Sequence, residues 1–228
     1  MKQLLVLLLF LLLASVIKAQ QNLNISLKQE LDSIFTLDQK YRQLDWLSNR
    51  QGKEDSIAQV YQLSTKDLPT FLHTKMQEVD ASNLERIEAI FKQYGYPGKS
   101  LVGTPTNEAV FYVLQHSPKI QQYMPQIEQA AKKGELAFHL YAMMEDRFLM
   151  QAGKEQVYGS QVYGFKTTNA ENGQEKWQRF VWPIKDPKYV NTRRKQAGFT
   201  MTVEENAKRL GVDYLIVTLE EVNKLQGK

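Results

Sequence analysis

Apolar residues in the first two thirds of the chain recur mostly at steps of three and four positions, which is the period of an amphipathic helix. This pattern predicts helices over residues 26–47, 57–72, 84–94, 107–116, 119–133 and 135–151. We expect Pro69 to bend the second of these helices, because proline interrupts the helical hydrogen-bond ladder. Six such segments predict a mainly α fold.

The pattern changes after residue 156, where aromatic and β-branched residues become frequent. The segments 157–165 and 177–182 flank a polar turn at 169–173, which predicts an antiparallel β-hairpin. Polar side chains of the first segment would then alternate between the two faces of a strand; they are Tyr158, Ser160, Gln161 and Tyr163.

The end of the chain predicts two more short helices. Asp186-Pro187 is a typical helix start, and an amphipathic segment covers 203–210. Residues 214–219 are compatible with a buried strand or with the start of a final helix. The predicted fold class is therefore mainly α (α+β), a compact helical domain of about six to eight helices with one small antiparallel hairpin.

Residues 1–19 have the pattern of a secretory signal peptide. Lys2 precedes an apolar run from Leu4 to Leu13, and small residues surround Ala19, where we expect cleavage. The run is shorter than the roughly 20 apolar residues that cross a bilayer as a helix. We therefore expect an exported protein, periplasmic or secreted, that is not inserted in the membrane after cleavage.

The remaining residues, 20–228, are expected to form a single globular domain. Its predicted parts are N-terminal helices at 24–80, a core at 84–198 and a C-terminal extension at 199–228. Removing 19 of the 228 residues leaves 209, and the loss of Lys2 and Lys18 lowers the formal net charge from +4 to +2. Basic residues are scattered among acidic ones, so nucleic acid is not an expected partner.

Cysteine is absent from the sequence, which excludes disulfides and thiolate metal sites. The three histidines, at positions 73, 116 and 139, are far apart and match no zinc motif. We expect no metal and no cofactor. The oligomeric state does not follow from the sequence.

Two adjacent charges, Asp146 and Arg147, interrupt the very apolar predicted helix 135–151. A helix with apolar residues around most of its circumference is usually enclosed, so each charge needs a partner or a cleft. His139 lies seven residues before Asp146, on the same stripe of the helix. The two charges either tie neighbouring elements together or belong to a functional site.

Further polar residues stand at predicted helix ends. Gln115 and His116 end an apolar helix, where a histidine can satisfy the helix C-terminus or transfer protons. Arg193 and Arg194 complement the dipole at the end of their helix, and we expect them to be solvated.

These residues together resemble a family. The sequence resembles the bacterial family catalogued as domain of unknown function 6624 over about Leu84–Gly198. The resemblance rests on Tyr94-Gly95-Tyr96-Pro97-Gly98 with Val102-Gly103, Gln115-His116, Asp146-Arg147, the segment 156–161 and Arg193-Arg194 with Gly198. Tyr96 stands where the family often has tryptophan, and Ser160 where it often has threonine. The resemblance implies no activity.

The sequence predicts three alternative functions. In the first, a polar cleft binds a small anionic metabolite or peptide through Gln115, Arg147, Tyr158 and Gln161. In the second, a hydrolase or lyase uses His116 as general base, Asp146 to orient it and Arg147 to stabilise negative charge. In the third, the long N-terminal helices form an interaction scaffold.

Overall fold

The computed structural model describes residues 23–168 and 175–225. The predicted signal peptide and the predicted turn at 169–173 lie outside these residues. The chain divides into two compact units, Met1–Ser117 and Pro118–Lys228. The predicted single domain over 20–228 stays a prediction.

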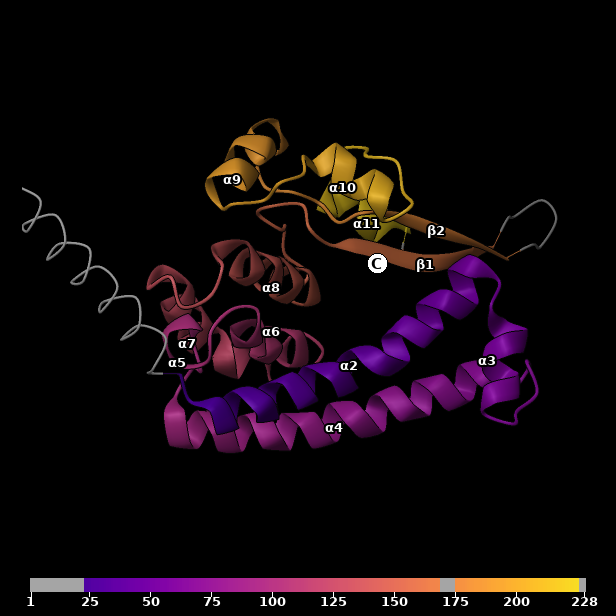
Figure 1. Cartoon of the computed structure of the whole chain (residues 1–228). Coiled ribbons are helices and arrows are strands. Elements are labelled where there is room, and N and C mark those ends of the chain that lie inside the picture. The colour runs from indigo at the N-terminus through magenta and orange to yellow at the C-terminus, as the bar shows by residue number, and fades with distance from the viewer. Residues whose placement is uncertain (1–22, 169–174, 226–228) are drawn as a thin grey trace, which may run out of the picture. The chain divides into compact units, whose positions relative to one another are not determined.

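The first unit consists of helices. They are α2 (Ile25–Gln51), α3 (Glu54–Val60), α4 (Leu68–Tyr94), α5 (Lys99–Val102), the 3-10 turn η1 (Thr106–Glu108) and α6 (Ala109–Leu114). The long helices α2 and α4 run side by side (Figure 1). Asn24 begins α2 by accepting a hydrogen bond from the Leu27 amide, and Gly52 ends it in the left-handed conformation.

The apolar stripes predicted for this unit form its core. Leu31 and Ile34 on α2 and Leu72 and Ile87 on α4 are almost completely buried. The boundary of α4 corrects the prediction, because Pro69 lies in the first turn of this helix instead of bending an earlier one. Proline is tolerated in the first turn, where its missing N–H would have no helical acceptor. The predicted segment 57–72 therefore splits between α3 and α4, and α4 continues through the segment predicted as a separate helix at 84–94.

The second unit combines helices with one hairpin. Its elements are α7 (Ile120–Lys132), α8 (Phe138–Gln151), β1 (Val162–Thr168), β2 (Glu175–Val181), the 3-10 turn η2 (Pro187–Tyr189), α9 (Val190–Gln196), α10 (Val203–Arg209) and α11 (Leu219–Leu225). β1 and β2 pair antiparallel, from Val162 opposite Val181 to Thr168 opposite Glu175. A buried apolar cluster joins the hairpin to α9 and α10; it contains Val181, Ile184, Val190, Val203, Ala207 and Val212.

The mainly α class with one antiparallel hairpin is confirmed over the described residues. The predicted start of the first strand is wrong, because β1 begins at Val162 and not at residue 157. Of the two alternatives for 214–219, the strand does not form, and the final helix α11 begins at Leu219. Within the described ranges, no helix combines the length and the apolar character that crossing a membrane requires.

Candidate functional site

The segment Gln156–Gln161 is a loop that α8 holds through Asp146. One carboxylate oxygen of Asp146, Oδ1, accepts hydrogen bonds from the Val157 and Tyr158 amides, at 2.7 and 2.9 Å. The other, Oδ2, accepts one from the Ser160 amide at 2.9 Å. These bonds use the amides that strand pairing would need, which explains why β1 starts only after the loop.

Gln156 closes the loop from inside. Its side-chain carbonyl accepts from the Gln161 amide at 2.9 Å, and its side-chain nitrogen donates to the Gln161 and Trp182 carbonyls, at 3.1 and 2.6 Å. The side chain of Gln156 is completely buried. A buried amide with its donor and acceptor both used stabilises one loop conformation.

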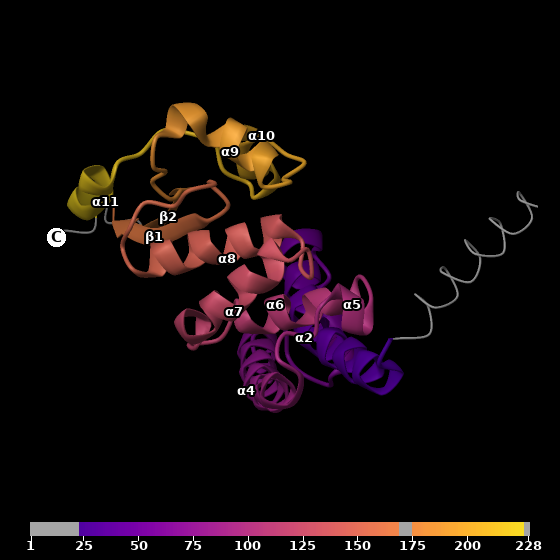
Figure 2. The ribbon, with the colours of Figure 1, turned by 90° about the vertical axis from the view of Figure 1, so that its left-hand side faces the viewer.

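Side chains from α9 and α10 hold the carbonyl groups of the same loop. Arg193 Nε donates to the Val157 carbonyl at 2.9 Å, and Arg194 Nη1 donates to the Tyr158 carbonyl at 2.8 Å. Asn206 on α10 donates to the Gly159 carbonyl at 3.4 Å. In Figure 2 the loop accordingly runs between α8 and the pair α9 and α10.

This arrangement corrects the expectation that Arg193 and Arg194 are solvated. Arg194 is only 2% exposed, and Arg193 is half-buried. Arg194 Nε also donates to the Met201 carbonyl at 2.8 Å, and its guanidinium lies 4.3 Å from the centre of the Phe199 ring. The arginine pair is therefore a structural clamp on the loop.

Asp146 is 0% exposed, and burial raises the pKa of its carboxyl group. The backbone amides and the Ser160 hydroxyl oppose this effect through their hydrogen bonds. A carboxylate has about four acceptor positions, and the three loop amides already occupy both oxygens of Asp146. To orient a histidine as general base, Asp146 would have to share an oxygen with one of these amides. The geometry favours the interpretation in which Asp146 positions the loop.

The other residues predicted for the site lie in both units. Gln115 and His116 follow α6 in the first unit, both half-buried. Arg147 lies on α8 and is half-buried, in the second unit. The predicted catalytic pairing of His116 with Asp146 joins two separately described units and stays a prediction.

Tyr158 and Gln161 belong to the clamped loop. The Tyr158 ring packs on Phe199, with ring centres 5.9 Å apart. The Gln161 side chain is buried and donates to the Met143 carbonyl and the Ser160 hydroxyl, at 3.3 and 3.0 Å. The predicted alternation of Tyr158 and Ser160 on a strand is wrong, because both precede β1.

A cavity of about 170 Å³ lies beside this loop. Its lining comes from α8, the loop, the α9 to α10 connection and α10; it consists of His139, Met143, Ser160, Arg194, Gly198, Phe199, Thr200, Met201, Asn206 and Arg209. Among these described residues the ionisable side chains are one histidine and two arginines. From the sequence, His139 was expected on the same helix stripe as Asp146, and Arg194 is one of the residues that carry the family resemblance. No sequence pattern indicated Asn206 or Arg209.

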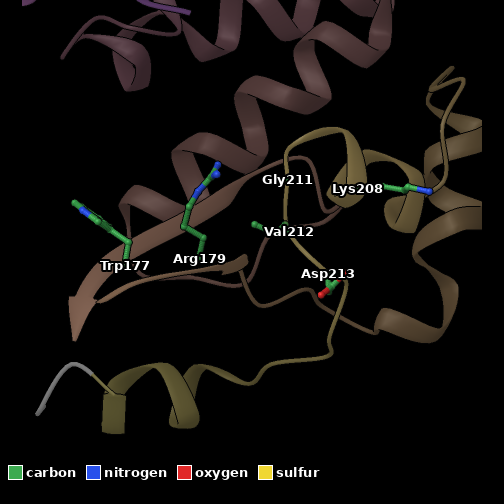
Figure 3. A pocket seen from close by; sticks show the side chains of 6 residues that line it. All are labelled: Trp177, Arg179, Lys208, Gly211, Val212 and Asp213. Atoms are coloured by element: carbon green, nitrogen blue, oxygen red, sulfur yellow. The ribbon is translucent and has the colours of Figure 1, made fainter. Parts of the chain in front are cut away.

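A second, larger hollow of about 490 Å³ lies between β2 and the end of α10. Figure 3 shows Trp177 and Arg179 on β2, Lys208 on α10 and Asp213 on the following segment. The Trp177 side chain is 61% exposed. The charged groups do not converge in this view, because Lys208 points away from Trp177 and Arg179. This hollow therefore lacks the geometry of a built site.

The residues described by the structure contain no group of three or more acidic or histidine side chains placed to hold a metal ion. A family model described as "Family of unknown function (DUF6624)" matches residues 27–217. The match is longer than the resemblance over about Leu84–Gly198 and includes most of both units. No curated protein and no solved structure matches the chain.

Proposed function

We propose that this chain, which belongs to the family of unknown function DUF6624, binds a small anion in the cavity beside the 156–161 loop. The observation that carries the proposal is the charge of the cavity lining. Its described charged side chains are Arg194 and Arg209, and both are cationic. A carboxylate or phosphate group of a metabolite or peptide is the chemistry that two guanidinium groups recognise best.

The hydrogen-bond pattern of the two arginines supports this use. The described bonds of Arg194 employ Nε and Nη1, so its second terminal nitrogen can donate to a ligand. Arg209 is exposed, and its described bond runs from Nη2 to Asn206 Oδ1 at 2.9 Å. Its remaining N–H groups form a fork suited to an anion. Arg194 would be the fixed donor and Arg209 the adaptable one.

His139 adds a polar group without adding charge. Burial lowers the pKa of its imidazole, which favours the neutral ring. A neutral ring donates one hydrogen bond and accepts one. The cavity is smaller than the roughly 300–1,000 Å³ typical of drug-sized ligands. Together these features favour a ligand with one anionic group and few further atoms.

The proposal changes the ligand-binding residues expected from the sequence. In this arrangement Tyr158 and Gln161 stabilise the loop. The residues that would contact the anionic ligand are Arg194, Arg209 and His139. The exported location expected from residues 1–19 belongs to the same proposal. An exported protein would encounter ligands from the cell envelope or the medium.

The test is a titration of the protein with inorganic phosphate and with succinate, followed by ¹H–¹⁵N NMR. We expect saturable shifts at the amides of Ser160 and of residues 198–201. Arg209→Gln should weaken binding by about tenfold or more, since it removes a charged ligand contact but no bond to the loop backbone. Arg179→Gln, which changes an exposed arginine outside the cavity, should leave the dissociation constant unchanged. Equal weakening by both variants would contradict a specific site.

A further inference from the structure

The first unit contains a cavity of its own, of about 190 Å³. Asp32 and Phe35 of α2 form one side, and residues at η1 and the start of α6 form the other. The complete lining is Asp32, Phe35, Pro105, Thr106, Glu108, Ala109 and Tyr112. Its ionisable groups are two carboxyls and one phenol, so its charge is opposite to that of the cavity in the second unit.

The two carboxyl groups differ in how they are compensated. Asp32 Oδ1 accepts from the Thr106 hydroxyl at 2.6 Å, and Asp32 Oδ2 forms an ion pair with Lys28 at 2.6 Å. Partial burial raises the pKa of Asp32, but these two hydrogen bonds outweigh that effect and hold the pKa below its usual value. The charge of Asp32 is therefore already balanced by Lys28.

Glu108 is half-buried, and burial raises the pKa of its carboxyl group. Over the described part of the chain, no cation offsets this effect. Glu108 and Tyr112 line the same cavity, and the negative charge of Glu108 adds to burial in raising the pKa of the Tyr112 phenol. The cavity thus holds about one uncompensated negative charge, in a site that is partly removed from water.

Aromatic rings form the apolar part of the same cavity. The rings of Phe35 and Tyr112 meet edge to face, with centres 5.0 Å apart. Both rings line the space that Glu108 also lines. A ring face attracts a cation through its quadrupole, and the attraction is stronger where water is partly excluded.

We propose that this cavity binds an organic monocation, an alkylammonium or guanidinium group, between the Glu108 carboxylate and the rings of Phe35 and Tyr112. A divalent metal ion fits less well, because the oxygens of Asp32 are occupied and the described residues offer no cluster of three metal-binding side chains. The volume suits a small free amine or one lysine or arginine side chain. Both sources share the chemistry, and the experiment separates them.

The probes are n-butylammonium, acetyl-lysine amide and the uncharged acetyl-norleucine amide, each titrated into the whole protein. We expect the two cations to shift the ¹H–¹⁵N resonances of Asp32, Phe35 and residues 106–112, with a dissociation constant on the order of 1 mM, typical of a small weakly held group. Tighter binding of the lysine amide identifies a peptide side chain as the ligand. Tighter binding of butylammonium identifies a free amine.

Three variants examine the contacts. Glu108→Gln should weaken cation binding by about tenfold, and Tyr112→Leu should weaken it severalfold, because they remove the charge and a ring. Tyr112→Phe retains the ring and should retain binding. Glu85→Gln, on the exposed face of α4, is the matched control for lost negative charge.

Two results would overturn the proposal. One is an equal response of the same resonances to acetyl-norleucine amide, since this would show apolar binding without recognition of charge. The other is a dissociation constant for Glu108→Gln within about twofold of that of the unchanged protein. The first comparison uses the unchanged protein and therefore holds even where a variant fails to fold.

Discussion

At the scale of single residues, His139, which lines the cavity beside the 156–161 loop, makes the stability of the folded protein depend on pH. Burial lowers the pKa of this histidine in the folded protein, so the unfolded chain binds the proton more tightly. The stability that comes from burying the neutral ring is present above the unfolded pKa of about 6.5. It is lost as the pH falls through the folded pKa. His139→Gln should therefore flatten the fall in stability between about pH 7 and pH 5.

The measurement is urea unfolding of the protein and of His139→Gln at several pH values across this interval. His73→Gln is the matched control, because His73 is exposed on α4. We expect the control to follow the unchanged protein. A His139→Gln profile parallel to both would show that His139 contributes nothing to the pH dependence.

The same scale shows what a sequence can indicate about single residues. Asp146 was recognisable as a charge that needs partners, because it interrupts an apolar helix. Its partners are backbone amides of the 156–161 loop. Every residue except proline carries such a donor, so no residue type marks the positions that supply them. For this reason the sequence indicated the importance of Asp146 but not its role.

At the scale of elements, Gly159 fixes the path of the clamped loop. It has φ +67°, and a Cβ atom there would lie 2.7 Å from Ile184 Cδ1 and from Val203 Cγ2. Gly159→Ala should therefore combine backbone strain with overpacking and destabilise the protein by about 2–4 kcal/mol. The two side chains belong to the buried cluster that joins the hairpin to α9 and α10, so packing in that cluster should change as well.

Gly153 is the matched control for the backbone contribution. Its φ is +66°, but a Cβ atom there would meet nothing within 4 Å. Gly153→Ala should cost only the strain of the left-handed conformation, about 1–2 kcal/mol. Chemical denaturation of both variants measures the difference. Equal losses of stability would mean that close packing at Gly159 contributes little.

The elements also show which parts of the fold are predictable. α7 and α8 follow the apolar period closely because local packing and local hydrogen bonds define a helix. The bend predicted at Pro69 was wrong, because proline bends a helix only when it lies in the helix interior. In the first turn of a helix proline is well tolerated. The start of β1 was misplaced because residues 157–161 have a strand-like composition while Asp146 takes their amides. That competition depends on tertiary structure and leaves no local pattern.

At the scale of the whole molecule, the chain divides into two compact units, and a buried apolar cluster is described in each of them. One cluster joins α3 to α4, and the other joins the hairpin to α9 and α10. This division could not be predicted from the sequence, because no segment of distinct composition marks the boundary at Ser117 and Pro118. The division predicts that damage to one core stays largely within its own unit.

Asp146→Asn tests this prediction. The asparagine places an NH₂ group against at least one loop amide in a buried site, which should destabilise the second unit by about 3 kcal/mol. Hydrogen exchange should then accelerate in the 156–161 loop, α9 and α10, while α2 and α4 keep their protection. Asp213→Asn, which changes an exposed carboxylate of the same unit, should alter neither region. Faster exchange in α2 and α4 to the same degree would show that the two units unfold as one cooperative body.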